Sequence, residues 1–293
     1  MPKFNWLLSS IVCAGIVTTS ALSVRSQALL PYTPQIDSEK LEQQGLQLLQ
    51  DAVQLIRFQQ YDLALVRAEL ATQLAPDNYE VWFILGTLYI QEEEIEEGIK
   101  VLQKAENLAP EQEGILFVLG NAYFRQGDYQ AALEKLEAGI EIEGNSPEAL
   151  FDLGNTYLKL DEFSKAIDSY EEAFKQEETF WPAINNVGLV QYERGNIEKA
   201  IANWQDALAI DGEQAEPKLA LAVAFYNEGD REKGIELAAS AIETDSRYAD
   251  IEFLRENLWG DRLIEDTKAL LALPQIQDIV TNFETNSEPE MME

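Results

Sequence analysis

A period of 34 residues is the feature of this sequence that most constrains its fold. The pattern is clearest in residues 79–112, where its members are Trp82, Leu85, Gly86, Tyr89, Gly98, Leu102, Ala105 and Pro110. The next two units repeat it without an insertion, first as Leu116, Leu119, Gly120, Tyr123, Ala132, Leu136 and Gly139, and then as Leu150, Leu153, Gly154, Tyr157, Ala166, Tyr170 and Ala173. A fixed period of this kind is typical of structural repeats that stack on one another.

Each unit contains the apolar faces of two helices. Positions 4, 7, 8 and 11 of a unit have the spacing of one helix face, and positions 20, 24 and 27 have the spacing of a second. A turn between the two helices is predicted by the glycine pairs Gly127-Asp128, Gly195-Asn196 and Gly229-Asp230, at positions 15 and 16. Glycine at position 8 would let the helices approach closely, so we expect a larger residue at Gly120 to be costly.

These positions are the signature of the tetratricopeptide-repeat (TPR) family, which the chain resembles over residues 45–248. The resemblance implies an all-α fold, a right-handed solenoid of helical hairpins with six repeats at 45–78, 79–112, 113–146, 147–180, 181–214 and 215–248. The outer repeats match less well, as expected for units with a solvent-facing side. We expect capping and C-terminal helices at 249–283 and an acidic tail at 284–293.

The N-terminal segment, residues 1–28, has the pattern of a signal peptide or a membrane anchor. Lys3 is followed by the apolar run Leu7–Val17, and Ser26 and Ala28 offer a small-residue cleavage site. Trp6–Val24 is free of charge and is close to the ~20 residues that span a bilayer. Either interpretation predicts a membrane-associated or exported protein, with residues 29–44 as a linker. A buried helix of a cytosolic protein is the remaining alternative.

Composition argues against several functional classes. The chain has 21 Lys and Arg against 53 Asp and Glu, a net charge of −32, which argues against nucleic acid as a partner. Histidine is absent and Cys13 is the only cysteine, so the commonest general base, a disulfide and a zinc cluster are all missing. We therefore expect neither catalysis nor a metal or cofactor.

The TPR resemblance implies a protein-binding groove lined by the first helix of each repeat. Carrying over the family's groove positions gives the following candidate residues: Phe83, Phe117, Asn121, Phe124, Arg125, Phe151, Asn155, Lys159, Asn185, Tyr192 and Tyr226. Such a groove would suit an extended segment or a helix of a partner protein. Alternatively, the aromatic residues bury against neighbouring repeats. Asn121 and Asn155 favour the groove, because an unsatisfied buried amide costs ~1 to 3 kcal/mol.

One known use of TPR grooves does not fit the sequence. Family members that grip the C-terminal carboxylate of a chaperone use lysine, arginine and asparagine side chains, partly from position 2. That position here holds Glu80, Glu148 and Glu216. A carboxylate clamp is therefore not expected.

The C-terminal stretch from Leu258 to Gln275, together with the repeats and the N-terminal segment, resembles cyanobacterial TPR proteins of photosynthetic-membrane biogenesis. Among these are the TPR proteins that interact with protochlorophyllide oxidoreductase. The resemblance implies a thylakoid-associated assembly factor whose partner is this enzyme of chlorophyll synthesis. The alternatives are a self-associating structural repeat protein and a soluble exported adaptor for another partner.

Overall fold

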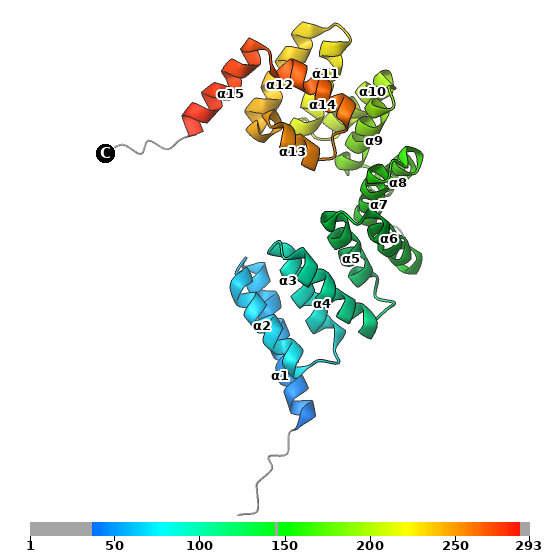
Figure 1. Ribbon diagram of the computed structural model, residues 1–293, viewed down its shortest axis with the longest axis vertical. Helices are drawn as coiled ribbons and strands as arrows, with labels where there is room; N and C mark the ends of the chain where they lie inside the picture. Colours follow the sequence, from blue (N-terminus) through cyan, green and yellow to red (C-terminus); the bar gives the residue numbers. More distant parts are fainter. Residues whose placement is uncertain (1–36, 144–145, 288–293) are drawn as a thin grey trace, which may run out of the picture. The chain divides into compact units, whose positions relative to one another are not determined.

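In a computed structural model the described residues, 37–143 and 146–287, form helices and no strand (Figure 1). The first twelve helices are α1 (Ser38–Arg57), α2 (Tyr61–Leu74), α3 (Tyr79–Gln91), α4 (Ile95–Leu108), α5 (Glu113–Gln126), α6 (Tyr129–Glu143), α7 (Pro147–Lys159), α8 (Phe163–Gln176), α9 (Trp181–Glu193), α10 (Ile197–Ile210), α11 (Ala215–Asn227) and α12 (Arg231–Thr244). A 3-10 turn, η1 (Ser246–Ala249), leads to α13 (Ile251–Glu256), α14 (Asp261–Leu271) and α15 (Pro274–Ser287). The predicted all-α fold is confirmed.

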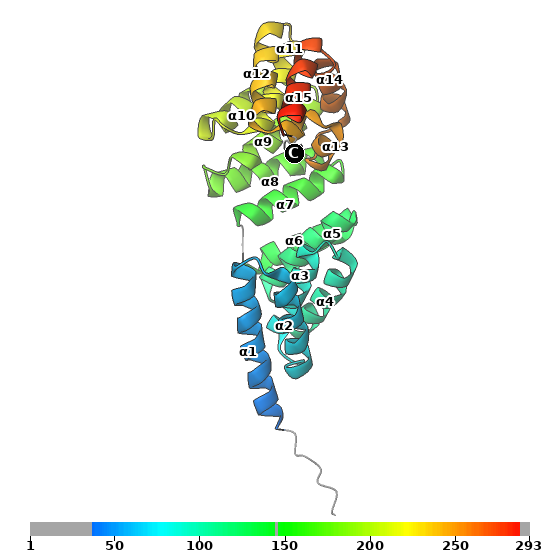
Figure 2. The same cartoon turned by 90° about the vertical axis from the view of Figure 1, so that its left-hand side faces the viewer.

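Successive helices pack as antiparallel hairpins. In Figure 2 the helices of a hairpin lie side by side, and α3 packs most extensively on α4, α5 on α6, α7 on α8, α9 on α10 and α11 on α12. The second helix of each hairpin also packs on the first helix of the next, from α2 on α3 to α10 on α11. The buried side chains accordingly form a series of clusters that neighbouring hairpins share.

Close packing within a hairpin depends on the glycine at position 8. A Cβ atom added at Gly120 would lie 2.7 Å from Cγ of Leu136, a fully buried residue of α6. Gly154 and Gly188 meet the rings of Tyr170 and Trp204 in the same way. The structure thus confirms the close approach that the sequence predicts at this position.

The turn inside each hairpin has one residue in the left-handed conformation, always at position 15. Three are the predicted glycines, Gly127, Gly195 and Gly229, with φ of 88°, 78° and 101°. The other three are Gln59, Glu93 and Asp161, with φ of 57°, 65° and 60°. The turn geometry is therefore kept even where the sequence has a residue with a side chain.

The first helix begins earlier than the sequence analysis expects. It starts at Ser38, inside the range 29–44 assigned to a linker. Gly45, Leu49 and Ala52 are buried on one face of α1, and Leu41 extends that face by a turn. Glu39 in the first turn also suits the positive end of the helix dipole.

The predicted signal peptide or anchor, residues 1–28, lies outside the described residues, as do 29–36 of the linker and 288–293 of the tail. None of the helices within the described ranges has the length and apolar character needed to cross a bilayer.

The C-terminal helices return to the repeats. α14 packs against α9 and α11, the first helices of the last two hairpins, whereas α15 packs against α12. Leu263, Ile264, Leu270 and Leu271 of α14 are buried in a cluster with residues of α9 and α11. The C-terminal segment therefore covers the first-helix face at this end of the repeats.

Candidate functional site: a pocket on the first helices

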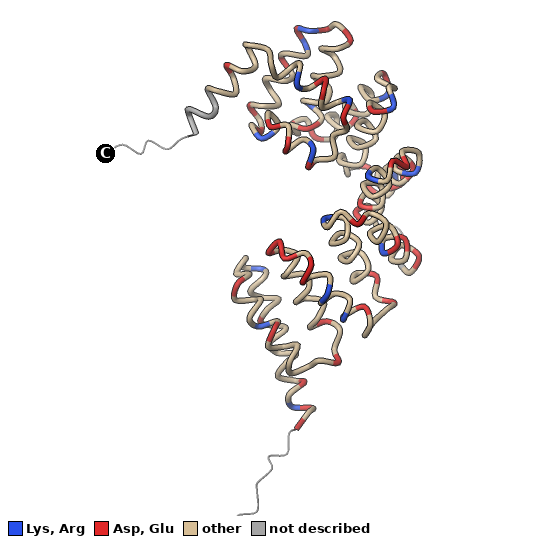
Figure 3. Tube along the Cα trace, in the orientation of Figure 1, with Lys and Arg blue, Asp and Glu red and all other residues tan. Residues whose placement is uncertain are grey.

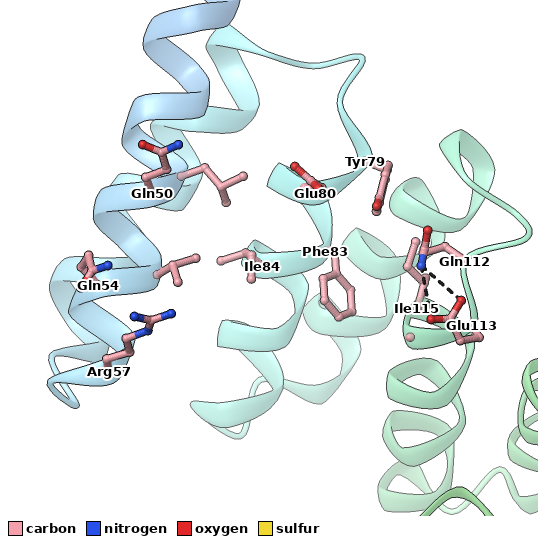
Figure 4. A pocket seen from close by; sticks show the side chains of 13 residues that line it. Gln50, Gln54, Arg57, Tyr79, Glu80, Phe83, Ile84, Gln112, Glu113 and Ile115 are labelled. Carbon is pink, nitrogen blue, oxygen red and sulfur yellow. Dashed lines mark hydrogen bonds between the residues drawn. The ribbon is translucent and has the colours of Figure 1, made fainter. Parts of the chain in front are cut away.

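A pocket of about 640 Å³ lies between the first helices of the first three hairpins (Figure 4). Its walls are α1, α3 and the start of α5. The apolar lining residues are Leu49, Val53, Phe83, Ile84 and Ile115, and the others are Gln50, Gln54, Arg57, Tyr79, Glu80, Gln112, Glu113 and Gly114. A concave site of this size, with an apolar lining and a few polar groups, has the usual character of a ligand site.

Charges of both signs border the pocket. Arg57 comes from α1, Glu80 from the first turn of α3 and Glu113 from the first turn of α5. The side chain of Gln112 donates a hydrogen bond to the Glu113 carboxylate at 3.2 Å. Arg57 can therefore pair with an acidic group of a ligand, and the two glutamates with basic groups or N–H donors.

Gly114 leaves open space at the α5 wall. A Cβ atom added there would have no neighbour within 4 Å, in contrast to the crowded glycines inside the hairpins. The space can therefore admit a ligand atom or a larger side chain without displacing the core.

The pocket uses the family's groove positions in a repeat where the sequence analysis did not apply them. Leu49, Val53 and Arg57 stand at positions 5, 9 and 13 of the unit 45–78, and Phe83 stands at position 5 of the next. Of the predicted groove residues, Phe83 alone lines this pocket. The same register, carried into the weakly matching first unit, would have found the α1 residues.

Two of the predicted aromatic residues pack inside the repeats. Phe117 is half-buried, and a Cβ atom at Gly139 of α6 would lie 2.6 Å from its ring. Phe151 contacts Tyr170 of α8, with ring centroids 5.6 Å apart, and meets Phe180 edge-on at 5.4 Å. Both side chains thus support the hairpins.

Phe124 and Tyr226 make contacts near the inner turns of their hairpins. Phe124 lies against Tyr129 at the start of α6, with a centroid distance of 5.3 Å. Tyr226 is half-buried, and the guanidinium of Arg231 lies 5.4 Å from its ring centroid. Each contact joins the end of a first helix to the start of the second.

The two predicted basic residues have different surroundings. Nη1 of Arg125 donates to the carbonyl oxygen of Ile90 at 3.0 Å, and Nη2 donates to the Glu93 carboxylate at 2.5 Å. Arg125 therefore joins α5 to the turn after α3. Lys159 is exposed and borders a separate hollow of about 310 Å³ beside the segment that precedes α14.

The predicted asparagines connect helices. Oδ1 of Asn155 accepts hydrogen bonds from the Tyr170 hydroxyl at 2.7 Å and from Nδ2 of Asn186 at 3.1 Å. Asn121 hydrogen bonds to Asp152, a carboxyl whose pKa burial raises to about 6. We favoured the groove for Asn121 and Asn155 because a buried amide would lack hydrogen-bond partners. Both amides have such partners within the repeats.

Tyr192 is buried, although the sequence analysis placed it in the groove. Its hydroxyl donates to the Asp266 carboxylate of α14 at 2.7 Å and accepts from Nδ2 of Asn227 at 3.2 Å. The Arg262 guanidinium lies 5.7 Å from the Tyr192 ring centroid. Burial and the nearby carboxylate both raise the pKa of the Tyr192 hydroxyl. It belongs to the interface with α14.

Asn185 is also fully buried, which contradicts its predicted place on an open groove. Its Nδ2 donates to Oδ1 of Asn186 at 3.1 Å, and its carbonyl oxygen accepts from Nε1 of Trp204 at 3.2 Å. Its amide also hydrogen bonds to Glu216 of α11, so Asn185 is enclosed by partners from within the repeats. Tyr192 is covered by the C-terminal segment, which a repeat pattern alone could not place.

Two glutamates attach the C-terminal segment to the repeats. The Glu193 carboxylate accepts from the backbone N–H groups of Arg262 and Leu263, at 3.2 and 2.9 Å, at the start of α14. Glu216 accepts from Nε1 of Trp259 at 2.9 Å. Burial raises the pKa of the Glu216 carboxyl to about 7, against the opposing effect of its hydrogen bonds with Trp259 and Asn185.

Family models match the repeats directly. One described as "TPR repeat" matches residues 120–161 and 188–229, and one described as "Tetratricopeptide repeat" matches residues 147–180. Another, "ChAPs (Chs5p-Arf1p-binding proteins)", matches residues 27–105. No curated protein matches the chain.

Several solved structures have the same fold. PilF of Pseudomonas aeruginosa is 15% identical, with a TM-score of 0.60, over 75% of this chain and 98% of that one. MamA is 23% identical, with a TM-score of 0.51, over 56% and 96% of the two chains. YrrB, described as a TPR protein with an unusual peptide-binding site, is 18% identical, with a TM-score of 0.50, over 65% and 97%. The repeat pattern, the helical hairpins and these matches identify the chain as a tetratricopeptide-repeat protein.

Proposed function

We propose that the chain is a non-catalytic scaffold that binds a segment of a partner protein in the pocket formed by α1, α3 and α5. The observation that carries the proposal is the contrast between the two ends of the first-helix face. At the C-terminal end α14 packs on α9 and α11, whereas the pocket at the other end has a volume of about 640 Å³ and open space at Gly114.

The residues that line the pocket indicate which kind of partner segment would fit. Leu49, Val53 and Phe83 offer apolar contacts, and the glutamine amides beside them can both donate to and accept from a peptide backbone. Arg57 and the glutamates favour a segment that carries both acidic and basic groups. YrrB, with its peptide-binding site, is a fold relative in which such a use is described.

The wider setting of this binding is also part of the proposal. We propose that the protein acts at or beyond a membrane as an assembly factor, because residues 1–28 have the pattern of a signal peptide or anchor. Protochlorophyllide oxidoreductase is the partner that the sequence resemblance suggests, and a thylakoid would then be the location. A soluble exported adaptor for another protein uses the same pocket.

The substitution Gly114→Leu tests the pocket, because it places a large side chain in the open space at the α5 wall. Binding would be measured with peptides selected on the unmodified chain from a displayed library of short random sequences, and with purified protochlorophyllide oxidoreductase. Gly212→Leu is the matched control, since Gly212 is exposed and is not among the residues that line the pocket. We expect Gly114→Leu to abolish peptide binding and Gly212→Leu to leave it unchanged. Equal binding by both variants would contradict the proposal.

A further inference from the structure

The first hairpin has an apolar stripe on its second helix that the other hairpins lack. Leu63, Val66 and Leu70 of α2 are 57%, 55% and 39% exposed. They stand at positions 19, 22 and 26 of their unit. The residues at these positions in the other five units are Glu97, Lys100 and Lys104; Ala131, Glu134 and Ala138; Lys165, Asp168 and Glu172; Lys199, Ala202 and Asp206; and Lys233, Glu236 and Ser240.

This face of the second helix is therefore polar or small everywhere except in α2. The three residues have the spacing i, i+3, i+7, so they share one side of the helix. The opposite side contains Ala64, Ala68 and Ala71, which are buried against α1 and α3. The hairpin thus packs without the stripe. A contiguous apolar face that the fold does not use is typical of an interaction surface.

Acidic groups border the stripe. Leu63 lines a hollow of about 310 Å³ together with Asp62 and with Glu92 from the turn after α3. Glu92, Glu93 and Glu94 are all exposed, and Figure 3 shows the acidic stretch at that turn in red. Arg125 pairs with Glu93, which leaves Glu92 and Glu94 facing solvent. The Leu63 end of the stripe is therefore bordered by negative charge, while Arg67 is exposed beside the stripe on α2 itself.

We propose that the exposed face of α2 binds an amphipathic helix of a partner protein that carries lysine or arginine beside its apolar side. The stripe covers two helical turns, about 10 Å, which suits the apolar anchors of a short helix. The flanking carboxylates match basic residues at the edge of that helix. This surface lies on a second helix, apart from the residues that line the pocket on α1, α3 and α5.

The charge of the chain favours this occupant over a second copy. Each copy carries a net charge of −32, so pairing two copies brings together surfaces of the same sign. A basic helix is attracted by the negative charge of the chain. An anionic bilayer is disfavoured because it has the same sign of charge as the chain.

The test measures binding of a synthetic leucine–lysine amphipathic helix of about four turns to the full chain by fluorescence anisotropy. The triple variant Leu63→Glu, Val66→Lys, Leu70→Lys gives α2 the residues that α4 has at these positions, and it changes the net charge by only one unit. We expect the triple variant to bind about tenfold more weakly or worse. A leucine–glutamate helix should not bind the unmodified chain.

A second variant examines the acidic border without touching the stripe. Glu92→Gln with Glu94→Gln is expected to weaken binding of the leucine–lysine helix and to reduce its salt dependence. Gly114→Leu should have no effect, because it acts on the pocket of the proposed function. Failure of one proposal is thus distinguishable from failure of the other.

Three results would overturn the inference. The first is a triple variant that keeps a native thermal unfolding curve and binds the leucine–lysine helix as tightly as the unmodified chain. The second is equally tight binding of the leucine–glutamate helix, which would make the contact purely apolar. The third is light scattering that shows dimers of the unmodified chain that the triple variant loses, which would make a second copy the occupant.

Discussion

The turn inside each hairpin depends on the backbone conformation of a single residue. Position 15 adopts the left-handed conformation in all six units, and three of them place a residue with a side chain there. For such a residue this conformation costs about 1 kcal/mol or more. The left-handed conformation is kept despite this cost, because the turn must join two helices that pack side by side.

Replacing Gln59 by glycine should therefore stabilise the protein. We expect Gln59→Gly to raise the free energy of unfolding by about 0.5–1 kcal/mol, since glycine adopts a φ of 57° without steric strain. The reciprocal change Gly127→Gln should lower it by a similar amount. Urea denaturation followed by circular dichroism would measure both. A destabilised Gln59→Gly variant would show that the side chain contributes more than the backbone strain costs.

The glycine at position 8 should behave in the opposite way. Gly120→Ala places a methyl group 2.7 Å from Cγ of buried Leu136, so we expect it to lower the free energy of unfolding by about 1–3 kcal/mol. Gly114→Ala is the matched control within the same helix, and it should be neutral or stabilising by up to about 1 kcal/mol. Thermal unfolding of the two variants would decide. Equal stability of both would mean that Leu136 moves aside at little cost.

The structural role of a residue could be predicted from the sequence where the same role recurs in every 34-residue unit. The position-8 glycines and the helix pairs follow from the spacing alone, because every hairpin meets the same packing demand. The prediction failed at Tyr192, which contacts a segment outside the period, and at Asn185, which is buried with Asn186, Trp204 and Glu216 as partners. It also passed over Leu49, Val53 and Arg57, because the first unit lacks the signature that marks the register.

At the scale of helices, the C-terminal segment determines which part of the first-helix face is open. α14 covers α9 and α11, and its start is held by Glu193 through two backbone N–H groups. Trp259 adds a hydrogen bond to Glu216 of α11. The segment therefore behaves as part of the core of the last hairpins, which agrees with the predicted capping role of helices beyond residue 248.

The attachment through Glu216 should depend on pH. Its pKa is raised to about 7 in the folded protein, from an ordinary value of 4.5, so the folded state binds the proton more tightly than the unfolded state does. Its contribution to stability is thus fully present below about pH 4.5 and is lost as the pH rises toward 7.

Glu216→Gln should remove that dependence, because glutamine accepts the Trp259 hydrogen bond without a charge. We expect the variant to be more stable than the unmodified chain by about 1–3 kcal/mol at pH 8, and the difference to shrink toward pH 4.5. Urea denaturation of both proteins across this pH range would measure it. A difference that is constant with pH would contradict the assignment.

At the scale of the whole molecule, stacked hairpins present two different surfaces in the first repeats. The first helices form the pocket, and the second helix α2 carries the apolar stripe with its acidic border. The family's register, carried into the first unit, would have found the α1 residues of the pocket. The stripe could not be located from the repeat signature, which marks packing positions that all units share, because it arises where one unit departs from the others.

We propose that a partner segment binds in the pocket on α1, α3 and α5. The most direct measurement compares the affinity of library-selected peptides for the unmodified chain, for Gly114→Leu and for the control Gly212→Leu, with unfolding curves for all three. We expect Gly114→Leu to lose binding while its stability is unchanged or higher. Retained affinity in a folded Gly114→Leu variant would contradict it.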